Sequence, residues 1–178
     1  KDTILPLDAH ALKTIAVVGP NADNRKALVG NYEGTASRYF TVLDGLHEYL
    51  GDKVEIRYSQ GCHLYADKIH SLSQEGELIS EVKGMCAESD VVICCLGLDA
   101  GLEGEEGDQG NQFASGDKPS LALPGHQEEV LRACLDSGKP VIVVVLSGSA
   151  LALNTADQEA AAVLQAWYPG ARGGLAVA

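Results

Sequence analysis

The stretch that decides the fold reads VVICCLGL and runs from Val91 to Leu98. A second stretch of the same kind, VIVVVL, runs from Val141 to Leu146. Both are apolar on both faces and rich in β-branched residues, which is typical of central parallel strands covered by helices on each side. The two stretches therefore predict an α/β protein built on a parallel sheet.

The flanking sequence extends this pattern into alternating strands and helices. Thr14 to Val18 and Ala162 to Trp167 are further apolar runs, and Val54 to Tyr58 alternates in the way of a strand nearer an edge. Helical spacing and helix-end residues indicate three helices, at residues 42–50, 73–88 and 125–137. The order predicts a doubly wound, mostly parallel sheet flanked by helices, a three-layer αβα sandwich.

Length and charge limit the function classes. The 178 residues fit one domain, and we expect it to be cut at both ends from a larger enzyme. The formal net charge of −12 argues against nucleic acid or an anionic membrane as a partner and favours a neutral ligand such as a sugar. No apolar run approaches the ~18 residues that a membrane-spanning helix needs.

The cysteines and the first turn argue against a cofactor or a metal. None of the five cysteines shows CxxC or Cys/His ligand spacing, which favours reduced thiols and, slightly, a cytoplasmic over a secreted or periplasmic location. Gly19-Pro20-Asn21 follows the first strand without a GxGxxG fingerprint, and Pro20 lacks an N–H for a pyrophosphate. A nucleotide- or flavin-binding domain is therefore disfavoured, and Asn21 and Asp23 are interpreted as turn formers.

A long acidic loop follows the first of the central strands. It reads GLDAGLEGEEGDQGNQFASGDKPSLALP from Gly97 to Pro124. Loops of this length are usually functional or disordered, and ligands of open α/β sheets bind at the carboxyl ends of strands. Crowded carboxylates raise one another's pKa, so a glutamate here could act as a general acid. The candidates are Glu103, Glu105, Glu106 and Asp108. A solvated acidic loop and a calcium site remain alternatives, although the spacing does not match an EF-hand.

Two other motifs invite a functional interpretation. Ser147-Gly148-Ser149 follows a strand but is not GxSxG, so a nucleophilic serine paired with His126 is disfavoured. The segment Trp167-Tyr168-Pro169-Gly170 could stack on a sugar, but a tryptophan that ends a central strand more often belongs to the core.

The motifs together resemble a known family. They are IAVVGPNAD (residues 15–23), LEGEEGD (102–108), LALPGHQ (121–127), KPVIVVVLSGSAL (139–151) and WYPGARGG (167–174). In order and spacing the chain resembles the C-terminal α/β-sandwich domain of glycoside hydrolase family 3, the β-glucosidases and β-xylosidases.

The resemblance implies a catalytic role that is shared between two domains. An Asp nucleophile would lie on an N-terminal (β/α)8 barrel of the same parent chain, and Glu105, Glu103 or Glu106, with Glu105 favoured, would be the acid/base. The parent would be a retaining, exo-acting enzyme on β-linked glucosides or xylosides, and this chain alone would be inactive. Lys118 stands where many relatives have Arg. A non-catalytic carbohydrate-binding or packing module is the alternative.

Overall fold

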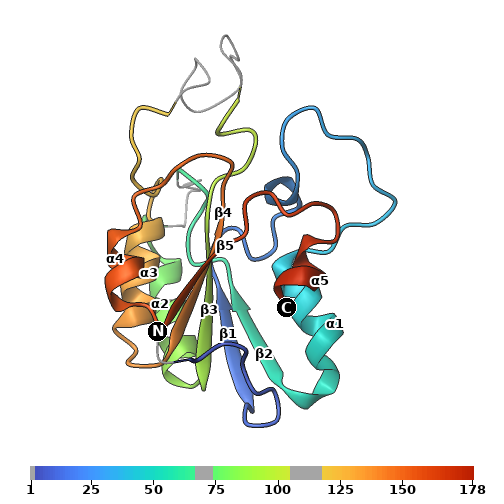
Figure 1. The fold of residues 1–178 in the computed structure, drawn as a ribbon. Coiled ribbons are helices and arrows are strands. Elements are labelled where there is room, and N and C mark those ends of the chain that lie inside the picture. Colours follow the sequence, from blue (N-terminus) through green and yellow to red (C-terminus); the bar gives the residue numbers. More distant parts are fainter. Residues whose placement is uncertain (1–2, 67–73, 105–117) are drawn as a thin grey trace.

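Five parallel strands form one sheet in the order β2-β1-β3-β4-β5 (Figure 1). They are β1 (Thr14–Val18), β2 (Glu55–Ser59), β3 (Val91–Gly97), β4 (Val141–Leu146) and β5 (Ala162–Gln165). The computed structural model describes residues 3–66, 74–104 and 118–178. The predicted α/β architecture is confirmed, and β2 lies at an edge of the sheet as its alternating sequence indicated.

Helices cover both faces of this sheet (Figure 1). On one face lie α2 (Leu78–Ala87), α3 (Gln127–Leu135) and α4 (Asn154–Glu159), and on the other lie α1 (Val42–Leu50) and α5 (Gly173–Val177). Two short 3-10 helices, η1 (Arg25–Leu28) and η2 (Gly51–Lys53), flank α1 in sequence. None of the helices in the described residues is long and apolar enough to cross a lipid bilayer.

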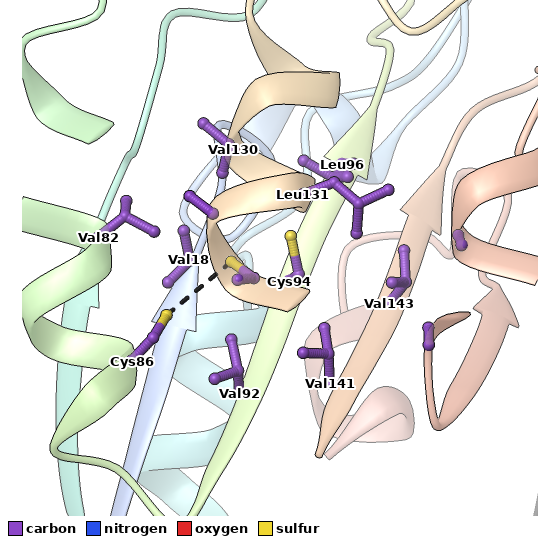
Figure 2. Packing of buried hydrophobic residues seen from close by; sticks show 14 of the residues in the cluster. Val18, Val82, Cys86, Val92, Cys94, Leu96, Val130, Leu131, Val141 and Val143 are labelled. Atoms are coloured by element: carbon purple, nitrogen blue, oxygen red, sulfur yellow. Dashed lines mark hydrogen bonds between the residues drawn. The ribbon is translucent and has the colours of Figure 1, made fainter. Parts of the chain in front are cut away.

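The central strands divide their side chains between two cores. Val92, Cys94 and Leu96 of β3 pack with α2 and α3, while the alternate residues of the same strand face α1. Figure 2 shows the first of these cores, where Val82 of α2 and Leu131 of α3 cover the sheet. A strand buried on both faces must be apolar at successive positions, which is why VVICCLGL and VIVVVL predicted the sheet.

All five cysteines are buried, and none of them forms a disulfide. Cys86 of α2 and Cys134 of α3 meet in the core with their sulfurs 3.9 Å apart (Figure 2). Burial raises the pKa of the Cys95 thiol to about 12. The pKa values of Cys86 and Cys134 are raised as well, so these three thiols are packing residues with little thiolate at neutral pH.

Most element bounds agree with the sequence within a few residues. The helix expected from Ser73 begins at Leu78, and residues 67–73 lie outside the described part of the chain. The helix expected from Gly125 begins at Gln127, because Gly125 has a φ of 58°, which a helix cannot contain. Helix α4 and the two 3-10 helices were not delimited from sequence.

Candidate functional site

A polar side chain joins the carboxyl ends of two strands, β3 and β4. The Asn21 amide donates to the carbonyl oxygens of Leu98 and Leu146, at 2.9 and 3.4 Å, and so joins the ends of β3 and β4 to the turn after β1. Gly19 makes this turn possible: its φ is 113°, and a Cβ there would lie 2.1 Å from the Cys95 oxygen. Asn21 is thus a buried turn residue, as predicted, and it ties three strand ends together at this edge, which we call the platform.

Of the four candidate loop carboxylates, Glu103 lies within the described residues, and it is held by three donors. The backbone N–H of Gly148 donates to Oε2 at 2.9 Å, and the Tyr168 phenol donates to the same oxygen. The Ser149 hydroxyl donates to Oε1. Gly148 leaves room for the carboxylate, because a Cβ at this position would lie 2.8 Å from Oε2. The half-buried Glu103 therefore fastens the start of the acidic loop to the turn after β4.

The other end of the same loop is fastened to the same turn. Lys118 donates from Nζ to the carbonyl oxygen of Ala150 at 2.5 Å. Burial lowers the pKa of Lys118, and the nearby Glu103 charge opposes this effect. Residues 103 and 118 therefore both attach to the turn formed by residues 148–150.

Trp167 corrects one prediction. It is 60% exposed with a φ of 57°, so the expectation that it belongs to the core is wrong. The reason is that β5 is the edge strand and ends at Gln165, two residues earlier than expected. The neighbouring Tyr168 turns inward instead, and burial and the Glu103 carboxylate raise the pKa of its phenol. The sequence singled out Tyr168 only within a segment that could stack on a sugar, and its hydrogen bond to Glu103 was not foreseen.

The serines after β4 do not form a hydrolase arrangement. Ser149 is committed to Glu103, and the Ser147 hydroxyl donates to the Ser149 carbonyl at 3.0 Å. His126 precedes α3, with its ring nitrogens 2.8 Å from Glu129 and 3.2 Å from Glu75. The structure therefore gives these residues the structural roles that the absence of GxSxG indicated.

A polar pocket lies beside this platform, among the loops that follow β1, β2 and β3. Its volume is about 550 Å³, and its walls include Asp23, Lys26, Tyr58 and Asp99. Asp99, the first acidic residue of the long loop, is only 8% exposed, and its Oδ1 accepts the N–H of Leu102 at 3.2 Å. The carboxyl-edge rule applied to β2 as well as β3 could have drawn attention to these residues.

A second cavity, of about 500 Å³, lies between α1, the N-terminal segment and the far face of the sheet. Its walls are almost entirely aliphatic, from residues such as Leu7, Leu46 and Ile142. Among the described residues, no Asp, Glu, His or Lys side chain lines it, and Tyr49 is its one ionisable side chain.

Three of the four predicted loop carboxylates lie outside the described residues. Glu105, Glu106 and Asp108 fall within residues 105–117, and the calcium alternative depends on the same stretch. Among the described residues, no group of three or more His, Cys, Asp and Glu side chains is arranged to hold a metal ion. The site is therefore defined by the fixed ends of the loop.

Replacing Glu103 should loosen the loop from the sheet. We expect Glu103→Ala to lower the free energy of unfolding by about 1–3 kcal/mol, because three donors lose their acceptor. Ser149→Ala, which removes one of the three, should cost less. Thermal unfolding measures stability, and limited proteolysis with mapping of the cleavage sites should show faster cutting within residues 104–118. Unchanged stability together with unchanged proteolysis would contradict the anchoring role.

Comparison with known proteins adds evolutionary evidence to this geometry. Residues 1–178 match the glycosyl hydrolase family 3 C-terminal domain. A β-xylosidase of Formosa agariphila is 37% identical over 99% of this chain, which spans 23% of that protein. A periplasmic β-glucosidase of Salmonella typhimurium is 31% identical over 93% of this chain, which spans 22% of it.

A solved structure agrees at the level of the fold. A β-glucosidase of Erythrobacter marinus superposes with a TM-score of 0.81 at 28% identity. The match covers 99% of this chain and 25% of the solved one. The present chain therefore spans about a quarter of the length of the proteins it resembles.

Proposed function

This chain belongs to the family of glycosyl hydrolase family 3 C-terminal domains, and on that basis we propose that it supplies the acid/base loop of a retaining β-glycosidase. Its partner is an N-terminal (β/α)8 barrel of the same parent chain, which carries the nucleophilic aspartate. The substrate is a β-linked xyloside or glucoside, the classes named for the relatives. The parent removes one sugar at a time from a chain end.

The observation that carries this proposal is the attachment of both loop ends to one turn. Glu103 is fixed to Gly148 and Ser149, and Lys118 to Ala150. Glu105 and Glu106 follow the anchor by two and three residues. Attachment at both ends restricts the positions that a carboxyl group on the loop can occupy. Proton transfer requires such a restriction, because the acid must be held within hydrogen-bond reach of the reacting atom.

Glu103 and its neighbours receive different roles in this proposal. Both oxygens of Glu103 already accept hydrogen bonds from its own domain, so we assign it to anchoring. The acid/base is Glu105, with Glu106 as the second candidate. In the first step this carboxylic acid protonates the glycosidic oxygen while the aspartate attacks the anomeric carbon. In the second step the resulting carboxylate takes a proton from the water that releases the sugar.

The stereochemistry of the product tests the reaction class. Proton NMR of a β-glycoside mixed with the full-length parent should show the β-anomer of the free sugar first, because two displacements restore the configuration. The 178-residue chain alone should release no sugar, because the two carboxyl groups of a retaining enzyme must lie about 5–5.5 Å apart and the nucleophile is on the barrel. First appearance of the α-anomer, or hydrolysis by the chain alone, would contradict the proposal.

A further inference from the structure

The polar pocket described above lies at the point where the strand order reverses. From β1 the sheet continues to β2 on one side and to β3 on the other, and the pocket opens among the loops that leave these three strands. Crevices at such reversal points are where open α/β sheets bind small molecules. At about 550 Å³ the pocket has the size of a small-ligand site.

The pocket walls combine a buried carboxylate, Asp99, and an exposed one, Asp23, with aromatic rings. Asp99 and Asp23 each use one oxygen within the protein, from Leu102 N–H at 3.2 Å and from the Thr41 hydroxyl at 3.1 Å. The second oxygen of Asp99 receives no hydrogen bond from the described residues, although this side chain is nine-tenths buried. Tyr58 is 38% exposed, and burial and the Asp23 charge raise the pKa of its phenol.

These walls select against anions and in favour of hydroxyl groups. Among the described wall residues, the two carboxylates stand beside one lysine, Lys26, and one imidazole, His63, and Pro20 contributes no N–H donor to the pocket. A phosphate or carboxylate ligand would meet repulsion here, in a chain whose net charge is already −12. Carboxylates accept hydrogen bonds from hydroxyls, the Gln60 amide both donates and accepts, and tyrosine rings offer an apolar face. This donor and acceptor set fits a neutral polyhydroxylated ring.

The pocket shares a residue with the base of the acidic loop. The Asp99 carbonyl accepts the N–H groups of Leu102 and Glu103, at 3.0 and 3.3 Å, so one turn carries both the pocket wall and the Glu103 anchor. An acid that protonates a glycosidic oxygen must lie next to the leaving group. We propose that this pocket binds the leaving-group sugar of an oligosaccharide substrate, a specificity role that rests on the function proposed above.

Kinetics with two leaving groups test this proposal in the full-length enzyme. The substrates are a β-linked disaccharide, xylobiose or cellobiose, and the β-glycosyl fluoride of the same sugar, whose leaving group is a single atom. Gln60→Ala and Tyr58→Ala should each lower the ratio of kcat/KM for the disaccharide to that for the fluoride about tenfold, which is the effect of losing one contact of about 1.4 kcal/mol. The loss should appear mainly as a higher KM for the disaccharide.

Tyr49→Ala provides the matched control, because this tyrosine is 68% exposed on α1, away from the pocket. An unchanged ratio in both pocket variants would overturn the proposal. If the wild-type enzyme cleaves neither substrate, the proposed function fails, and the pocket is then tested by NMR titration of the 178-residue chain with the disaccharide. Shifts of the Gln60 side-chain amide would support a sugar site, and their absence at saturating disaccharide would overturn it.

Discussion

Glu105→Gln in the full-length enzyme should lower kcat for a glycoside with a poor leaving group by about 10²–10⁴-fold, the usual contribution of a general acid. A glutamine at this position can neither protonate the glycosidic oxygen nor take a proton from water. An activated aryl glycoside needs no protonation, so its first step should be affected far less. Steady-state kinetics across a series of leaving groups measures this difference, which a misfolded variant would not show.

Two further observations identify the residue. Azide should restore turnover of the activated substrate, because a small anion can attack the glycosyl-enzyme intermediate without a general base. In the same variant, the fall of kcat/KM at high pH, which reports ionisation of the general acid, should also disappear. If Glu106→Gln shows these signatures and Glu105→Gln does not, the acid/base is Glu106.

Glu48→Gln, an exposed substitution on α1, is the control and should leave both substrates unaffected. The assignment of the acid/base to this loop is wrong if Glu105→Gln, Glu106→Gln and the double variant all hydrolyse the poor substrate at the wild-type rate.

The central strands were predictable because a strand buried on both faces has apolar residues at consecutive positions. Val141 to Leu146 is apolar at every position, and the sheet buries every one of them. The alternating run near Tyr58 likewise predicted an edge strand, and β2 lies at an edge. The outcome differed for Trp167, because the apolar run from Ala162 does not reveal that β5 lies at an edge of the described sheet, beside β4 alone among its strands.

The position of the acidic loop was predictable, but the contacts of its ends were not. A long acidic loop after a buried strand pointed to the carboxyl edge from composition alone. The partners of Glu103 could not be deduced, since Ser149 and Tyr168 lie 46 and 65 residues further along the chain. Pairing over such separations is fixed by the order of the strands in the sheet, which local patterns do not encode.

Gln127 is the clearest case of a residue whose importance only the fold reveals. It begins α3, and its side chain is completely buried. The amide oxygen accepts the N–H of Gly97 at 2.7 Å, and the amide nitrogen donates to the carbonyl oxygens of Gly97 and Leu64 at 2.8 and 2.7 Å. One side chain therefore joins α3 to the end of β3 and to the pocket wall.

Gln127→Leu should consequently lower the free energy of unfolding by about 3–5 kcal/mol, because leucine fills the space but leaves backbone groups unpaired in the interior. In a domain of this size the midpoint of thermal unfolding should fall by roughly 10 °C. Urea unfolding followed by circular dichroism measures the change. Gln158→Leu, on the exposed side of α4, is the control and should stay within about 0.5 kcal/mol of the wild type.

Gln127→Glu separates hydrogen bonding from packing, because it preserves the shape of the side chain. An ionised carboxylate accepts but cannot donate, so at pH 7 the oxygens of Gly97 and Leu64 would face a buried charge. Burial raises the pKa of such a carboxyl group in the folded state above its unfolded value near 4.3. The folded state then binds more protons than the unfolded one, so the deficit relative to wild type should shrink as the pH falls from 7 toward 4. A deficit that stays constant over this range would show that packing alone, and not the three hydrogen bonds, makes Gln127 necessary.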